Sequence, residues 1–276
     1  MKSFIYKGAK SVKLGRFLTE MLPGLRFSSL RRMLGEGRIA VNTRRVKKEV
    51  NLNPGDEVRV YGEEGISAFR SERLYDDENI SIAVKPRGVE TKNFAVLVSE
   101  ELGENIVPVH RLDTNTRGIL MMAKNERAFK DAVALFKKGL VEKYYMALLC
   151  GSFEREGIFT AYLKKHSSGG IVEISPCAKP GFEEIRTGIV PVEKREGFTL
   201  VKIRLYTGKT HQIRAHTAFL GCPVLGDTKY GNFELNRLAR AKRQYLTAVE
   251  LSFGSIPKGN TLNYLSGKRF EIRCDF

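Results

Sequence analysis

The charge distribution along the 276-residue chain is the feature that most constrains its fold. Residues 1–62 hold 14 Lys and Arg against five Asp and Glu, a net charge of +9, whereas the rest of the chain carries only +7. Between these regions the stretch EEGISAFRSERLYDDE, residues 63–78, is polar and lacks hydrophobic periodicity, as interdomain linkers do. The sequence therefore predicts a small basic domain over 1–62, a linker over 63–78 and a larger domain over 79–276.

The basic region predicts a pair of helices and a small sheet. One face of the first helix, which ends near Pro23-Gly24, carries apolar residues at helical spacing, namely Phe17, Leu18, Met21 and Leu22. A second helix is expected from about Ser28, a candidate N-cap, to Leu34. Strands are expected over 38–42 and 56–60.

Seven arginines of this region are candidate RNA contacts, because a guanidinium can donate two parallel hydrogen bonds to a phosphate. They are Arg16, Arg26, Arg31, Arg32, Arg38, Arg44 and Arg45. The alternative is an ordinary solvated charged face. The run from Val12 to Tyr61, which contains LRRMLGEGRIAVN and LNPGDEVRV, resembles the S4 RNA-binding domain, a family that binds structured RNA through its helix pair.

The larger region shows the strand and helix patterns of an α+β domain. Strands are expected over 80–84, 119–123, 143–149, 171–174, 184–190 and 199–205. Asn125 is a candidate N-cap for a helix whose apolar positions recur at helical spacing up to Gly139. Because the later strands follow one another as hairpins, we expect a mixed, mostly antiparallel sheet rather than a doubly wound one.

Asp113 lies in the polar loop HRLDTNTRG, residues 110–118, directly before a strand that is expected to be buried. A short carboxylate in such a loop can serve simply as an Asx-turn. The order His-Arg-Leu-Asp differs from the His-Arg-Asp of a kinase catalytic loop, and no Gly-rich phosphate loop precedes it. The residues alone therefore leave a turn residue and a reactive carboxylate as alternatives.

A second polar motif, YTGKTHQIRAH at 206–216, runs from a strand end through a glycine turn into a helix. Thr210 is its candidate N-cap, and Arg214 follows one turn later. His211 and His216 are five residues apart and do not share a helix face as zinc-binding histidines do. The four cysteines form no CxxC pair and are expected to be free thiols, so the sequence predicts no metal site.

Five patterns occur in one order along the larger region: KPRG at 85–88, HRLDTNTRG at 110–118, KYYMAL at 143–148, GKTHQIRAH at 208–216 and CPVLGDTKYG at 222–231. Together they resemble the RluA-type pseudouridine synthases, which isomerise uridine in RNA. The resemblance implies that Asp113 is the catalytic aspartate, Tyr145 the active-site tyrosine and Arg214 the basic partner of the aspartate. It also implies substrate contacts by further residues of these motifs, namely Lys85, His110, Arg111, Lys209, Thr210, His211 and Gln212.

The implied reaction breaks the N1 glycosidic bond of a uridine, turns the uracil and rejoins it through C5, so it needs no cofactor. It needs an ionised carboxylate beside the ribose, and Arg214 would keep Asp113 charged in a pocket that excludes water. The nucleotide must also leave the base stack, with Arg111 filling the vacated space and Tyr145 stacking on the uracil.

The formal net charge of +16 favours a polyanionic partner. We expect structured RNA, with ribosomal RNA ahead of transfer RNA, and neither DNA nor a membrane. No apolar run approaches the roughly 18 residues that cross a bilayer, and no secretory signal is present, so we expect a cytoplasmic protein. The sequence does not determine the oligomeric state, and a monomer is the default expectation. The other classes considered are an RNA-binding protein without catalysis and a phosphate-ester hydrolase that uses Asp113, although no Walker pattern or metal triad supports the hydrolase.

Overall fold

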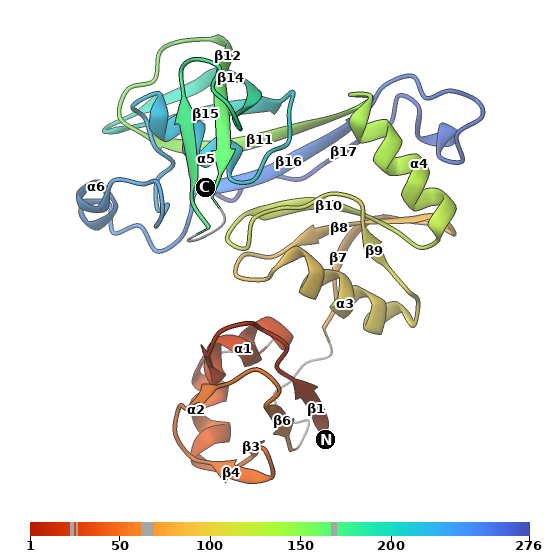
Figure 1. The fold of residues 1–276 in the computed structure, drawn as a ribbon, viewed down its shortest axis with the longest axis vertical. Helices are drawn as coiled ribbons and strands as arrows, with labels where there is room; N and C mark the ends of the chain where they lie inside the picture. The colour runs from red at the N-terminus through yellow and green to blue at the C-terminus, as the bar shows by residue number, and fades with distance from the viewer. Residues whose placement is uncertain (23–24, 26, 62–68, 167–169) are drawn as a thin grey trace. The chain divides into compact units, whose positions relative to one another are not determined.

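The computed structural model describes residues 1–276 except 23–24, 26, 62–68 and 167–169. The chain divides into two compact units (Figure 1). The first unit contains Met1–Ser71 and Lys92–Glu104, and the second contains Glu72–Thr91 and Asn105–Phe276.

The first unit combines helices with short antiparallel strands. These elements are β1 (Lys2–Ile5), β2 (Val12–Lys13), α1 (Leu14–Met21), α2 (Phe27–Gly35), β3 (Ile39–Val41), β4 (Arg44–Val46), β5 (Asn51–Leu52), β6 (Glu57–Val60) and most of α3 (Thr91–Leu102). Four strands form a sheet in the order β1-β6-β3-β4, and β2 pairs with β5. The predicted helix pair and both predicted strands are confirmed, although α2 begins at Phe27, so that Ser28 lies within it.

The core of this unit explains why α1 and α2 form. Leu14, Phe17 and Leu18 recur at helical spacing on α1 and are buried in one cluster with Leu30 and Met33 of α2. Each such side chain gains about 1.5–3 kcal/mol by leaving water. The expected end of the first helix at Pro23-Gly24 lies outside the described residues, and α3 was not predicted at all.

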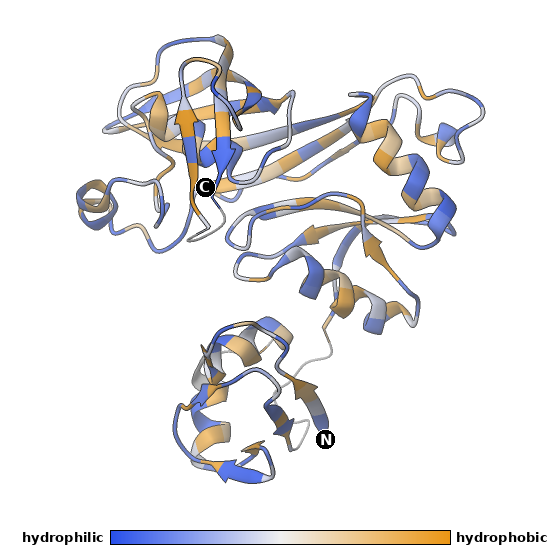
Figure 2. Cartoon of the chain, in the orientation of Figure 1, coloured by the Kyte–Doolittle hydropathy of each residue, from blue (hydrophilic) through white to orange (hydrophobic). Residues whose placement is uncertain are grey.

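The second unit is built on one large mixed sheet. Its strands are β7 (Glu72–Asp76), β8 (Ile80–Lys85), β9 (Val107–Pro108), β10 (Arg117–Ala123), β11 (Val141–Cys150), β12 (Gly157–Lys165), β13 (Val172–Ser175), β14 (Glu183–Arg195), β15 (Phe198–Leu205), β16 (Leu246–Phe253) and β17 (Arg269–Glu271). Its helices are α4 (Glu126–Lys137), α5 (Gln212–Phe219), α6 (Phe233–Leu238) and the 3-10 helix η1 (Asn263–Leu265). Hydrophobic residues concentrate in the inner strands, and hydrophilic residues occupy much of the connecting loops (Figure 2).

The strand order is β13-β12-β14-β15-β11-β16-β10-β8-β7, with β17 beside β16 and β9 beside β10. Within the described residues, β10 and β16 pair in parallel and the other neighbours pair antiparallel. The predicted α+β class with a mostly antiparallel sheet is therefore confirmed.

The predicted linker over 63–78 is only partly comparable with the structure, since residues 62–68 lie outside the described residues. Its second half is not a linker. Residues 72–76 form β7, which pairs with β8, and Leu74 and Tyr75 pack against the core of the second unit. Its charged residues gave this segment no strand-like pattern of apolar residues. Two of them form ion pairs, Glu72 with Arg117 and Asp76 with Lys124.

The sheet brings the polar motifs to one region. The loop before β10 leads into Gly118, which has a φ of 138° and whose Cβ, if it had one, would lie 2.2 Å from the carbonyl oxygen of Ala248 on β16. Only glycine therefore permits the parallel pairing that anchors this loop beside β16. β16 also pairs with β11, and β15, which leads to α5, is the next strand after β11 in the sheet.

Two helix starts were predicted in this unit. Asn125 caps α4 as expected, because its side chain accepts a hydrogen bond from the N–H of Ala128 at 2.9 Å. The N-cap prediction at Thr210 is wrong by one residue: α5 begins after His211, whose left-handed φ of 55° sets the turn into the helix.

Candidate active site

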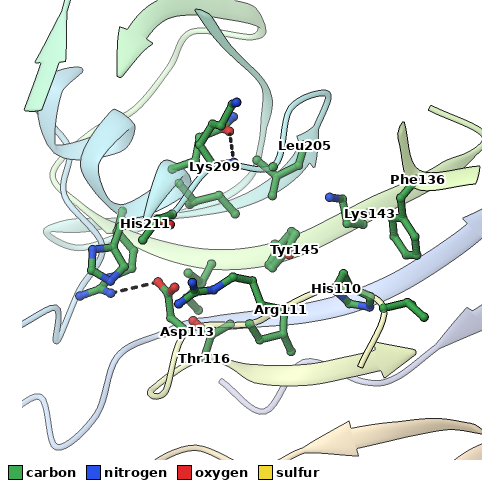
Figure 3. Close-up of a pocket in the computed structure, with 18 of the residues that line it drawn as sticks. His110, Arg111, Asp113, Thr116, Phe136, Lys143, Tyr145, Leu205, Lys209 and His211 are labelled. Carbon is green, nitrogen blue, oxygen red and sulfur yellow. Dashed lines mark hydrogen bonds and ion pairs between the residues drawn. The ribbon is translucent and has the colours of Figure 1, made fainter. Parts of the chain in front are cut away.

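Asp113 lines a cavity of about 360 Å³ that is bounded by the loop before β10, by β11 and by the start of α5 (Figure 3). The loop is fixed through its backbone. The Thr116 N–H donates to the Asp113 carbonyl oxygen at 3.0 Å, and the Thr91 hydroxyl bonds both the carbonyl oxygen and the N–H of Leu112. Because the turn uses the backbone carbonyl of Asp113, its carboxylate is not consumed by an Asx-turn and faces the cavity.

Arg214 connects Asp113 to a second carboxylate. Its Nη1 donates to Oδ2 of Asp113 at 3.0 Å, while its Nε and Nη2 donate to the two oxygens of Asp227 at 2.6 and 2.9 Å. The Asp227 side chain is completely buried and also accepts from the backbone N–H groups of Lys229 and Tyr230. Asp227 thus fixes the guanidinium so that a single N–H group reaches Asp113.

This arrangement leaves the second carboxylate oxygen of Asp113 open. Of the two carboxylate oxygens of Asp113, only Oδ2 has a hydrogen-bond partner among the described residues. Burial alone lowers the pKa of Arg214, but the carboxylates of Asp227 and Asp113 raise it above its ordinary value. Burial opposes ionisation of Asp227, yet Arg214 and two backbone N–H groups hold the pKa of Asp227 below its usual range. Arg214 and Asp227 therefore form a fixed charged pair beside Asp113.

Tyr145 of β11 lines the same cavity and is only 6% exposed. The pairing of β11 with β16 shifts register between Tyr144 and Tyr145, a bulge of the kind that re-aims a side chain. Burial, and then the negative charge of Asp113, raises the pKa of Tyr145 well above its ordinary value. This favours the protonated hydroxyl, which can donate a hydrogen bond.

Four of the residues that the resemblance assigns to substrate binding line the cavity beside these groups, namely Arg111, Lys209, Thr210 and His211. Lys209 forms an ion pair with Glu183. The Nδ1 atom of His211 lies 2.9 Å from the hydroxyl of Tyr230, and burial lowers the pKa of this histidine. The structure brings these four residues together with Asp113, Tyr145 and Arg214.

His110 and Gln212 also line the cavity, and both form hydrogen bonds within the fold, while the buried Nδ1 of His110 has no partner among the described residues. His110 accepts a hydrogen bond from the Met121 N–H at Nε2 and packs against the ring of Phe136, and burial lowers its pKa to about 3. Gln212 is 2% exposed, and its carboxamide bonds the Thr207 hydroxyl and the Lys209 N–H. These side chains shape the loop and the turn that carry their neighbours.

Lys85, which the resemblance assigns to substrate binding, is not among the residues that line the cavity. It is completely buried, and its Nζ donates to the carbonyl oxygens of Pro86, Val89 and Thr114. Burial lowers the pKa of Lys85 to about 7. Its position ties the turn after β8 to the loop that carries Asp113.

Sequence reasoning gave no role to three residues that complete this region. Asp227 and Tyr230 belong to the CPVLGDTKYG pattern, and Tyr230 packs against Arg214 with the guanidinium 5.4 Å from its ring centre. Lys143, the first residue of KYYMAL, lines the end of the cavity near His110 and Phe136 (Figure 3). The available signal for Asp227 was that it is the one acidic residue of the CPVLGDTKYG pattern.

Six of the seven candidate arginines of the first unit lie within the described residues, and five of these six, including Arg45, are exposed. Arg38 and Arg45 support the fold, because they donate to the carbonyl oxygens of Tyr61 and Gly37. Four others are exposed, namely Arg16, Arg31, Arg32 and Arg44, and Arg16 and Arg31 line a cavity of about 620 Å³. Arg26 lies outside the described residues.

The described residues contain no group of three or more His, Cys, Asp or Glu side chains that could hold a metal ion. The four cysteines are free thiols, as predicted. No helix in the described ranges has the length and apolar character to span a membrane.

Comparison with known families identifies the class of enzyme. A family model described as RNA pseudouridylate synthase matches residues 67–219, the span that contains Asp113, Tyr145 and Arg214. The chain belongs to the RNA pseudouridylate synthase family, and it is an RNA pseudouridine synthase, an isomerase. The resemblance of the five motifs between residues 85 and 231 to pseudouridine synthases is thereby confirmed.

Individual relatives cover most of the chain. It is 31% identical over 270 residues to ribosomal large subunit pseudouridine synthase C of Vibrio cholerae, which covers 87% of this chain and 84% of that protein. The Escherichia coli protein of the same name is 32% identical over 274 residues, with the same coverage. The solved structure of human RNA pseudouridylate synthase domain containing 4 shares the fold, with a TM-score of 0.59 at 21% identity over 73% of this chain and 88% of that one.

Proposed function

We propose that this enzyme isomerises specific uridines in large-subunit ribosomal RNA and that Asp113 carries the chemistry. Two relatives whose names refer to the large ribosomal subunit match over most of their length, which supports this substrate over transfer RNA. The observation that carries the mechanism is the single hydrogen bond from Arg214 to Asp113, with one carboxylate oxygen left facing the cavity.

The reaction conserves all atoms of the nucleoside. The N1–C1′ bond breaks, the uracil turns, and a C5–C1′ bond forms. C5 then loses its proton while N1 gains one. The open oxygen of Asp113 serves this sequence either as a nucleophile at the sugar or as a base on it. In both cases Arg214 orients the carboxylate through a charge-assisted hydrogen bond from its Nη1 to Oδ2 of Asp113.

The cavity volume of about 360 Å³ lies within the range of small-molecule sites, so it suits one extruded nucleoside better than a stacked helix. Extrusion costs roughly a few kcal/mol. Stacking on Tyr145 is worth about 1–3 kcal/mol and offsets part of that cost. Arg111, at the cavity wall and exposed to solvent, takes the space that the base vacates.

The basic domain over 1–62 adds RNA contacts away from the chemistry, in the manner of an S4 domain, and the catalytic domain follows it over 79–276. The exposed Arg16, Arg32 and Arg44 support this role because guanidinium groups bind phosphates without regard to sequence. We place the enzyme in the cytoplasm, where it acts as a monomer on its RNA.

Tritium release tests the proposed reaction, because C5 of uridine loses its hydrogen when the new bond forms. The purified enzyme is incubated with two transcripts labelled with tritium at uridine C5, one of large-subunit ribosomal RNA and one of a transfer RNA pool. We expect release from the ribosomal transcript. Release from the transfer RNA alone would reassign the substrate, and no release from either would contradict the proposal.

The target position follows from mapping pseudouridines in ribosomal RNA of cells with and without this protein. One or a few positions should lose the modification in cells that lack the protein. An unchanged map of the large-subunit RNA would contradict the assigned substrate.

A further inference from the structure

A basic and aromatic surface lies on α6 and the turn after it, outside the cavity. We define it by Phe233, Arg237, Leu238, Arg240 and Lys242 and name it the α6 surface. We propose that the α6 surface is a second contact site for the RNA substrate, in which the cations bind phosphates and Phe233 packs against a base. This inference rests on the proposed function and concerns how the substrate is held.

The orientation of α6 places these side chains on its outer side. Asn232 caps the helix, since its side chain accepts a hydrogen bond from the Leu235 N–H at 3.0 Å. Leu235 and Ala239, one turn apart, pack against a buried cluster of the second unit. Phe233 and Arg237 are also one turn apart and therefore share the opposite face. Figure 1 shows α6 at the periphery of that unit.

The apolar members of the α6 surface are unusually open to solvent. Phe233 is 81% exposed, the highest value of any large apolar side chain among the described residues, and Leu238 is 70% exposed. An exposed aromatic ring beside cations is typical of surfaces that bind single-stranded nucleic acid, where bases stack on the ring.

The cations of the α6 surface are unpaired. In the part of the chain that the structure describes, the side chains of Arg237, Arg240 and Lys242 have no hydrogen-bond or ion-pair partner. Many exposed cations elsewhere in the second unit do have acidic partners, for example Lys194 with Glu154 and Arg195 with Glu193. Unpaired guanidinium groups keep their donors for an anionic ligand.

The α6 surface is fastened to the residues that hold Arg214. The Asn236 carboxamide accepts from the Gly226 N–H at 2.7 Å and donates to the Asp227 carbonyl oxygen at 3.1 Å. Gly226, with a φ of 74°, lies so near the Arg243 carbonyl oxygen that a Cβ would be 1.7 Å from it. RNA bound at the α6 surface is therefore held at a fixed distance from Asp227 and the cavity.

Binding measurements with charge-matched variants test the inference. R237A/R240A removes two unpaired cations, and K194A/R195A removes two paired ones, so both lower the net charge by two. The dissociation constant for an unmodified transcript of large-subunit ribosomal RNA is measured at several salt concentrations. We expect R237A/R240A to reduce the slope of log affinity against log salt by about 0.7–0.9 for each lost contact. K194A/R195A should leave the slope nearly unchanged, and equal slopes for the two variants would overturn the inference.

Phe233 provides an independent test, because its contribution does not depend on salt. F233A should weaken binding of the same transcript about fivefold or more without changing the salt slope. F233Y keeps a stacking ring and should bind like the unsubstituted enzyme. Equal affinity of F233A and F233Y for the transcript would contradict the proposed contact between Phe233 and a base.

Tritium release by the unsubstituted enzyme separates failure of this inference from failure of the proposed function. If the enzyme releases tritium but R237A/R240A and F233A bind the transcript normally, only the inference about the α6 surface fails. If the enzyme neither binds the transcript nor releases tritium from it, both fail.

Discussion

Arginine has different surroundings in the cavity and in the N-terminal unit. Arg214 is almost fully buried, and carboxylate oxygens of Asp113 and Asp227 accept three hydrogen bonds from it. Arg16 is ion-paired with Glu20 on α1, and Arg32 is ion-paired with Glu36, the residue that follows α2. More than half of each arginine side chain is open to solvent.

The difference lies in what surrounds the charge. Removing one carboxylate from a buried guanidinium leaves buried charge without a partner, which is costly. The fold therefore holds the guanidinium and its carboxylates in one geometry. An exposed guanidinium is screened by salt and can move to meet a phosphate. Substitutions in the cavity should therefore change the rate of the chemical step, and substitutions on the N-terminal unit should change affinity.

The largest effect is expected for D227N, which weakens the clamp on Arg214 without touching the substrate. We expect the single-turnover rate at saturating enzyme to fall about 100-fold, because a small misplacement of a catalytic group costs about that much. D275N is the matched control, since Asp275 forms a similar two-pronged pair with Arg87 outside the cavity. Equal rate losses in the two variants would mean that D227N acts through general destabilisation.

A smaller effect, on affinity, is expected for R32A/R44A in the N-terminal unit. Loss of two phosphate contacts should weaken RNA binding about tenfold and reduce its salt dependence, while the single-turnover rate at saturating enzyme stays unchanged. K2A/K7A, with the same charge change in the same unit, serves as the control. A reduced single-turnover rate in R32A/R44A would contradict the expectation that the N-terminal unit contributes to affinity and not to the chemical step.

The smallest effect concerns His216, on the helix that carries Arg214. Burial lowers the pKa of His216 to about 4, below its ordinary value of 6.5. As pH falls below 6.5, the unfolded chain binds a proton there and the folded chain does not, so the free energy of unfolding decreases. Between pH 6.5 and 5.5 this loss is at most about 1 kcal/mol.

Urea unfolding of the unsubstituted enzyme and of H216N at these two pH values measures the effect. H216N should lose less stability over this interval, whatever its stability at pH 6.5. An identical loss in both proteins would show that His216 does not titrate differently in the folded and unfolded chains.

The sequence predicted elements whose patterns are local. α4 lies where Asn125 and the spacing of apolar residues predicted a helix. α1 lies where apolar residues at helical spacing predicted one. α3 was missed because its residues lack a clear amphipathic pattern, and β7 was missed because charged residues dominate it. α5 begins later than expected because His211 adopts a left-handed turn that no local signal specifies.

The candidate site was predictable only through resemblance to a family. Asp113 and Arg214 are 101 residues apart in the chain, and no periodicity brings them together. The burial of Lys85 and the clamp by Asp227 depend on tertiary packing, so neither could be assigned from motif membership. The sequence motifs indicated which residues lie near Asp113. The structure distinguishes the side chains that line the cavity from those that position the lining side chains.

The single-turnover rate of D113N, with enzyme in saturating excess over labelled ribosomal transcript, tests the account most directly. Asparagine keeps the shape of the side chain and removes the charged oxygen. We expect a rate at least about 100-fold below that of the unsubstituted enzyme with RNA affinity maintained, whereas D76N, at an exposed aspartate of β7, should keep the normal rate. A D113N enzyme that releases tritium as fast as D76N would contradict this expectation.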